Sequence, residues 1–345
     1  PREVLFGNPD RASPQISPDG TRLAYLAPVN GVLNVWVGPA GTPDQAKPVT
    51  NDTSRGIRRY FWAFTNQHII YMQDKGGDEN WRVYSVDLAR GDIKDLTPFE
   101  KVAAQVEGVS HRIPDEIIVG LNNRNPQYHD LHRVNIRTGQ MDLLAENNEY
   151  AGYVTDDDYK VPFAMKMTPD GGSEIFKSTA TGTWETFIKI GMEDSMTTSP
   201  LGLDKAGKSL FMLDSRGRNT AALAALNIAD GSAKILGENK QADVSGALTH
   251  PTENHIQAYS ANYDRVKWTV LDPAIESDFK YLDGVAEGEP DGLAAVVEPP
   301  DHHARRPGER DPGEQVGEHP ARARPAVGGT EGEPAAHQQP GDERQ

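Results

Sequence analysis

The sequence predicts an all-β fold, a β-propeller built from four-stranded antiparallel blades, and three observations support this prediction. Two independent series of turns recur with one period, the apolar runs between the turns are short, and long amphipathic helical patterns are absent. A period in the forties that supplies about four short strands is typical of a propeller blade. Helical solenoids of similar period need sustained apolar spacing of about 3.6 residues, so they are not favoured.

The two series of turns establish the repeat. Turn-like segments that precede an apolar run begin at Ser17, Phe64, His111, Thr155, Asp204 and His250, with separations of 47, 47, 44, 49 and 46 residues. A later turn in each unit is marked by Gly41, Gly91, Gly139, Gly182 and Gly231, with steps of 50, 48, 43 and 49 residues. Because both series share one period, the chain is predicted to repeat one structural unit.

The apolar runs inside each unit are typical of strands. Runs such as "RLAYLAP", "HIIYMQ" and "SLFMLD" are rich in β-favouring residues and too short for a typical helix. Gly, Pro, Asn or Asp bounds each run, which predicts strands joined by hairpins.

Residues 1–289 are therefore expected to form the propeller domain. Six blades are predicted, at about 13–51, 57–98, 102–146, 148–192, 195–238 and 241–285. A seventh blade would begin where the composition changes, and it is expected to be lost. An open ring of six blades would expose two apolar faces and unpaired strand edges, which predicts a tendency to aggregate.

The composition changes abruptly in residues 290–345. This stretch contains 9 Pro and 8 Gly, and it lacks Phe, Tyr, Trp, Ile, Met, Lys, Ser and Asn. It has almost nothing to bury, so a disordered tail is expected. The abundant amino acids are those of GC-rich codons, which favours translation of a shifted reading frame; a genuine Pro/Ala-rich tail is the alternative.

The totals exclude several classes of function. A net charge of −16 argues against nucleic acid as a partner, because binding a phosphate backbone requires clustered Lys and Arg. The chain has no Cys, so it has no disulfide, no thiolate zinc site and no cysteine nucleophile. No apolar run reaches the roughly 18 residues of a membrane span. No cofactor or metal is expected, and the compartment stays open between cytoplasm and periplasm. The first residue is Pro, which suggests a processed or truncated start.

Three stretches of the chain are distinctive: "REVLFGNPDRASPQISPDGTRLAYLAP", "DKGGDENWRVYSVDL" and "LDSRGRNTAALAALN". They resemble the N-terminal propeller of the prolyl oligopeptidase (S9) family of serine peptidases. The resemblance covers roughly residues 2–285 and is to the branch that contains acylaminoacyl peptidases and dipeptidyl aminopeptidases. The tetrapeptide "SPDG" by itself is less specific, since it also occurs in TolB-like propellers.

The resemblance implies an α/β-hydrolase domain that follows the propeller, carries Ser, Asp and His, and cleaves short peptides, while the propeller limits access to small substrates. The nucleophile of such a domain occupies a G-x-S-x-G elbow. Ser110 in "GVSHR", Ser173 in "GGSEI", Ser215 in "LDSRG" and Ser245 in "DVSGA" all depart from that motif. The chain is therefore expected to have no catalytic residue, to be inactive alone, and to be the substrate-gating portion of a serine peptidase.

Two alternatives stay open from the sequence. The chain could be a stand-alone TolB-like propeller that serves as a binding or scaffold module. A separate chain could also supply the hydrolase domain in trans. By resemblance, the expected partners are short peptides and an α/β-hydrolase domain.

The acidic hairpin "KGGDEN" offers the first candidate site residues, Asp78, Glu79 and Asn80. Gly76 and Gly77 permit positive φ, and the three polar side chains can bond backbone amides in a turn before the next strand. This turn role competes with a functional one, in which the acidic tip pairs with a peptide amine or with an arginine of another domain.

Two arginines in "LDSRGRN", Arg216 and Arg218, are the second candidate pair. Each could form a structural ion pair with a carboxylate of a neighbouring loop, or capture a substrate carboxylate. His129 and His132 are three residues apart on a predicted strand and point to opposite faces, so they are not expected to share a metal.

Overall fold

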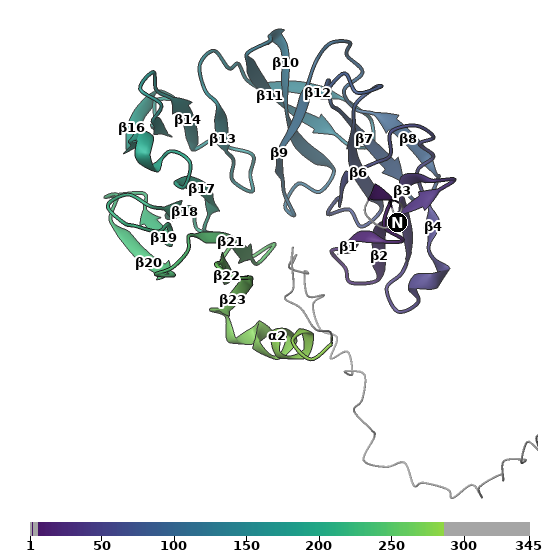
Figure 1. Ribbon diagram of the computed structural model, residues 1–345. Helices are drawn as coiled ribbons and strands as arrows, with labels where there is room; N and C mark the ends of the chain where they lie inside the picture. Colours follow the sequence, from purple (N-terminus) through teal and green to yellow (C-terminus); the bar gives the residue numbers. More distant parts are fainter. Residues whose placement is uncertain (1, 3–5, 286–345) are drawn as a thin grey trace, which may run out of the picture. The chain divides into compact units, whose positions relative to one another are not determined.

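The computed structural model describes residue 2 and residues 6–285 of the chain. The predicted tail at 290–345 lies outside these residues. Within them the fold is a β-propeller of six antiparallel sheets, and this confirms the predicted fold class (Figure 1).

Each sheet is one blade whose strands follow one another in chain order. The strands of blades one to three are β1 (Ala12–Ile16), β2 (Arg22–Val29), β3 (Val32–Pro39), β4 (Lys47–Pro48), β5 (Arg59–Trp62), β6 (His68–Gln73), β7 (Arg82–Asp87), β8 (Asp92–Asp95), β9 (Ala104–Val109), β10 (Glu116–Asn125), β11 (Tyr128–Asn135) and β12 (Met141–Ala145). Those of blades four to six are β13 (Gly152–Val154), β14 (Phe163–Met167), β15 (Ser173–Ser178), β16 (Trp184–Ile190), β17 (Ser199–Leu203), β18 (Ser209–Asp214), β19 (Ala222–Asn227), β20 (Ala233–Gly237), β21 (Val244–Thr249), β22 (Ile256–Asn262) and β23 (Val266–Val270).

Five blades have four strands, and blade six has three among the described residues. After β23 the chain forms two short helices, η3 (Pro273–Ile275) and α2 (Glu276–Leu282), instead of a further strand. Pro273 occupies the first position of η3, and the carboxylate of Asp272 accepts a hydrogen bond from the amide of Ala274 at 3.0 Å, so this stretch has a helix start signal. No helix of the described residues combines the length and the apolar character needed to cross a membrane.

Apolar side chains join each blade to the next, in chain order. Ile69 of blade two packs with Val35 of blade one, and Ile70 of blade two packs with Val119 of blade three. The alternation of β6 therefore serves both neighbours, as expected when a sheet is buried on both faces. Further clusters join blade three to four, four to five and five to six. Among residues 6–285, no apolar cluster contains residues of both blade six and blade one. The expected tendency to aggregate stays a prediction.

His68, at the start of β6, couples this packing to pH. Its side chain is 1% exposed, its Nδ1 lies 3.0 Å from the hydroxyl of Thr65, and its Nε2 has no hydrogen-bond partner. Burial lowers the pKa of His68, the guanidinium of Arg137 lowers it further, and the carboxylate of Asp87 opposes both. An unfolded His titrates near pH 6.5, so the unfolded chain binds this proton first as the pH falls.

We therefore expect the contribution of His68 to stability to be complete above about pH 6.5 and to be lost as the pH falls toward its lower folded-state pKa. Urea unfolding of the wild type and of His68→Gln at pH 7.5 and 5.5 measures this. The wild type should lose more stability between the two values than the variant. Equal losses would assign the titration to another group.

Candidate functional site

The candidate residues lie in loops at one end of the sheets, here called the proximal face. This face consists of the loops that join the second strand of each blade to the third and the loops that join successive blades. Antiparallel strands alternate in direction, so both kinds of loop lie at the end where the chain enters each blade. The remaining loops form the distal face. Residues 74–81 and 215–221, which hold both groups of candidates, belong to the proximal face.

The acidic hairpin between β6 and β7 is organised by two carboxylates. Asp78 accepts hydrogen bonds from the amides of Lys75 at 3.2 Å and Asn80 at 3.1 Å. The side chain of Asn80, followed by these amides, holds the pKa of Asp78 below its ordinary value. Glu79 has a φ of 60°, in the left-handed region. These contacts are those of the predicted turn, and the role of the three polar side chains toward a peptide or another domain stays a prediction.

Asp74 anchors this hairpin from below, and sequence reasoning missed it. Its side chain is 2% exposed and forms a two-point ion pair with Arg55, whose Nη2 lies 3.1 Å and whose Nε lies 3.3 Å from the carboxylate oxygens. The amide of Glu79 donates to the same carboxylate at 3.3 Å. Arg55 belongs to the loop that joins blades one and two, and a Cβ on Gly77 would lie 3.1 Å from its Nη1. The acidic tip is thus fixed to the neighbouring blade.

Arg216 and Arg218 both form ion pairs. Arg216 binds Asp214 through Nε at 2.8 Å and Nη2 at 2.7 Å, and Arg218 binds Glu238 in the loop that joins blades five and six. Although burial opposes it, the guanidinium of Arg216 lowers the pKa of Asp214. Neither the hairpin nor the arginine loop reaches the other through any hydrogen bond or ion pair of the described residues, so the structure does not assemble the five candidates into one cluster.

A third pair of the same kind occurs in blade three. Arg124 binds Asp130 through Nε and Nη2, both at 2.8 Å, and the amide of Asn147 donates to the same carboxylate at 2.6 Å. Blades two, three and five therefore each hold an Asp–Arg pair at the proximal face. The signal in the sequence is an Asp near the second hairpin of each blade, as in "YMQD", "YHD" and "FMLD".

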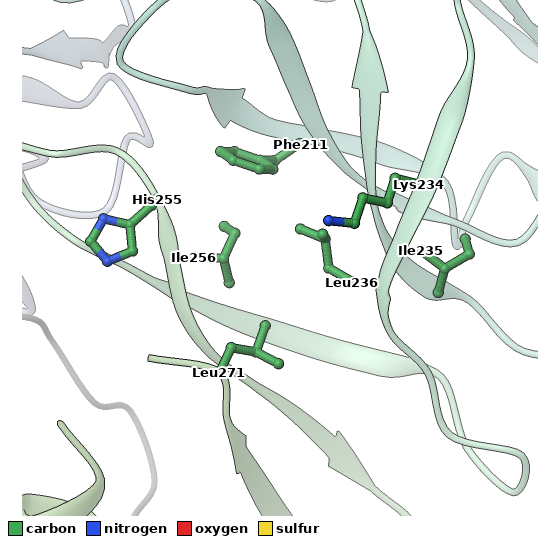
Figure 2. A pocket seen from close by; sticks show the side chains of 7 residues that line it. All are labelled: Phe211, Lys234, Ile235, Leu236, His255, Ile256 and Leu271. Carbon is green, nitrogen blue, oxygen red and sulfur yellow. The ribbon is translucent and has the colours of Figure 1, made fainter. Parts of the chain in front are cut away.

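A hollow of about 380 Å³ lies elsewhere, between blades five and six (Figure 2). It is lined by Phe211, Lys234, Ile235, Leu236, His255, Ile256 and Leu271. Most of these side chains are apolar, and Nε2 of His255 already lies 2.9 Å from Asp272 Oδ2. The hollow lacks the convergent polar groups that orient a ligand. Within residues 2 and 6–285 no group of three or more His, Cys, Asp or Glu side chains is placed to hold a metal ion.

Two curated relatives match most of this chain. Dipeptidyl aminopeptidase BIII of Pseudoxanthomonas mexicana is 48% identical over 289 residues, which are 84% of this chain and 42% of that protein. Dipeptidyl peptidase family member 6 of Caenorhabditis elegans is 27% identical over 298 residues, 82% of this chain and 40% of that protein. The chain thus spans less than half the length of either relative. No family model matches the sequence.

Among solved structures, the β-propeller domain of the Trilobed protease from Pyrococcus furiosus is similar in fold. The match covers 77% of this chain and 84% of that domain's chain, with 15% sequence identity and a TM-score of 0.47. The 48% identity shows that this β-propeller is homologous to the matching part of dipeptidyl aminopeptidase BIII, and the predicted resemblance is confirmed.

Proposed function

We propose that this chain is the non-catalytic propeller portion of a serine peptidase that acts on short peptides, and that its proximal face docks an α/β-hydrolase domain and limits access to it. The observation that carries the proposal is the similarity to dipeptidyl aminopeptidase BIII, of which the chain covers 42%. The absence of a G-x-S-x-G motif from all 345 residues is consistent with chemistry located outside this portion.

The distribution of exposed apolar side chains also supports docking at the proximal face. Met192, Met196 and Tyr263 lie in proximal loops, with 64%, 92% and 63% of their surfaces exposed. The described loops of the distal face between residues 17 and 255 hold none of the exposed large hydrophobic residues, and the distal ends of the strands hold two less exposed ones, Ile16 at 44% and Val109 at 42%. Exposed apolar groups that gather on one side of a protein mark an interaction surface.

The candidate residues fit two roles in this arrangement. The tip at Asp78, Glu79 and Asn80 is held by Asp74 and presents carboxylates to the solvent, where they can attract the amino group of a peptide. Arg218 is 29% exposed and faces Glu238, so it can exchange this partner for a carboxylate of the docked domain.

A chimera tests the proposal. The matching residues of this chain replace the corresponding 289 residues of dipeptidyl aminopeptidase BIII. We expect the chimera to release dipeptides from short peptides and to discriminate against long ones. The unmodified relative, assayed on the same peptides, is the reference for both rates. The 345-residue chain alone should release none.

Two outcomes would contradict the proposal. A folded chimera that cleaves nothing would show that this propeller does not serve a peptidase, and peptide binding by the chain alone would then favour a stand-alone binding module. If the chimera cleaved long and short peptides at equal rates, the proposed gating role would be contradicted, and only the proposed docking role would remain.

A further inference from the structure

Three exposed methionines gather on blade four and are here called the methionine patch: Met167, Met192 and Met196. Their exposed fractions are 53%, 64% and 92%. Met167 ends β14 at the proximal side, and the other two lie in the loop that joins blade four to blade five. Exposed large apolar side chains are normally scattered singly, so three in one place need an explanation.

The register of blade four places the side chain of Met167 on its side toward blade five. Met167 pairs with Ser173, which pairs with Ile190, so these residues share one face of the sheet. Ile190 packs into the cluster shared with blade five, and the loop 191–198 follows it directly. A Cβ on Gly171 would lie 3.0 Å from Cγ of Met192, so that methionine rests on the hairpin that follows Met167. The methionine patch therefore joins the hairpin to the start of the loop at Met192, and Met196 lies four residues further along the same loop.

The loop that carries Met192 and Met196 is firmly held. Asp194 accepts a hydrogen bond from the hydroxyl of Ser215 at 2.6 Å, and its carbonyl accepts from the amide of Thr198 at 2.9 Å. The hydroxyl of Ser215 also lies 2.7 Å from that of Thr197. Ser215 and Thr198 are 6% and 2% exposed, and Asp194 and Thr197 are partly buried, so this network is largely shielded from solvent. A largely shielded polar network thus fixes a loop whose methionine side chains are exposed to the solvent.

An exposed but fixed apolar group is suited to binding. Pre-organisation reduces the entropy lost on association, and the unbranched thioether adapts its shape to a partner surface. Methionine is also enriched at protein interfaces relative to the rest of the surface. The methionine patch therefore has the properties of a contact surface for a folded partner.

We propose that the methionine patch is the contact that blade four makes with the α/β-hydrolase domain. This inference rests on the proposed function. The patch lies on the proximal face, as does the exposed loop residue Tyr263, and more than half of dipeptidyl aminopeptidase BIII lies outside the part that this chain matches. A segment of that length is large enough to form a folded domain that covers the patch. The contact is apolar, and its core consists of Met192 and Met196.

Peroxide oxidation followed by mass spectrometry of peptides tests the contact directly. Hydrogen peroxide converts an exposed thioether to a sulfoxide, and the isolated chain should be oxidised rapidly at Met192 and Met196. In the chimera with dipeptidyl aminopeptidase BIII, we expect oxidation at these two sites to be slower by about tenfold or more, as for residues in an interface core. Met212, which is 0% exposed, is the slow control in both proteins.

The outcomes separate this inference from the proposed function, because protection is measured without reference to activity. Equal oxidation rates in the chain and in an active chimera would overturn the inference and leave the proposed function intact. Protection in an inactive chimera would support the contact and count against the function. Protection in the isolated chain that grows with its concentration would identify a second copy as the occupant and overturn the inference.

A charge placed in the patch gives a second test. Met196→Glu in the chimera should weaken docking, which is measured as about tenfold faster oxidation of Met192 than in the unsubstituted chimera. The matched control is Leu143→Glu, which places the same charge at a residue that is 55% exposed on the outer strand of blade three. An unchanged oxidation rate of Met192 in Met196→Glu would contradict an apolar contact at this point.

Discussion

Phe163→Ala is expected to lower the free energy of unfolding by about 3–5 kcal/mol. Phe163 is 0% exposed and lies in β14, at the junction of blades four and five. It packs with Leu210 and Met212 of blade five, and its ring centroid lies 5.3 Å from that of Phe187. Truncation removes the contacts that the ring makes within blade four and with blade five. The rigid sheets on either side cannot move in to fill the cavity.

Urea unfolding measures this loss. Phe6→Ala is the matched control, because Phe6 is 82% exposed and the same truncation there should change stability by no more than about 0.5 kcal/mol. If Phe163→Ala lowered the free energy of unfolding as little as Phe6→Ala, the packing between blades four and five would contribute little to stability. The variant should also expose the apolar faces of both blades, so its tendency to aggregate is expected to rise.

The repeat made the architecture predictable from the sequence. A turn residue must adopt a backbone conformation that few residues tolerate, so turns leave a visible and regular trace. Asn66 and Gly91, from the two series of turns, have φ values of 57° and 75°. The strands between them were predictable because their apolar runs are short and lie between such turns.

The end of blade six could not be predicted from the repeat. The pattern requires a fourth strand after β23, whereas the chain forms η3 and α2. Asp272 and Pro273 are helix start signals, but both residue types are also common in the turns of this chain. Because Asp272 and Pro273 are equally compatible with a turn and with a helix start, the sequence at this point does not distinguish the two. The tertiary packing of the residues that follow determines which one forms.

One contact of the candidate residues was predictable from the sequence, and the anchor of the acidic hairpin was not. Arg218 was expected to pair with a carboxylate of a neighbouring loop, and it binds Glu238, 20 residues along the chain. Asp74 and Arg55 were missed, because each is an ordinary charged residue beside a turn and their separation of 19 residues carries no periodic signal. Only the adjacency of blades one and two brings them together.

Asp74→Ala is expected to release the acidic hairpin. The substitution removes the partner of Arg55 and the acceptor for the amide of Glu79. Because Arg55 is 40% exposed and can be hydrated, the expected loss is about 1–3 kcal/mol, less than for a fully buried ion pair. Hydrogen exchange should show the larger effect, with faster exchange at Glu79 and its neighbours and little change in the strands of blade five.

Two variants control for this result. Asp92→Ala removes a carboxylate that is 70% exposed and pairs with Arg90 at 3.2 Å, so it should leave the exchange of the hairpin unchanged. Asp78→Ala removes the acceptor at the tip and keeps the anchor below it. In the chimera, Asp74→Ala should therefore lower the rate on short peptides at least as much as Asp78→Ala, because it displaces the whole tip. A rate that falls only in Asp78→Ala would mean that the position of the hairpin does not matter, and that the Asp78 carboxylate acts from any conformation of the loop.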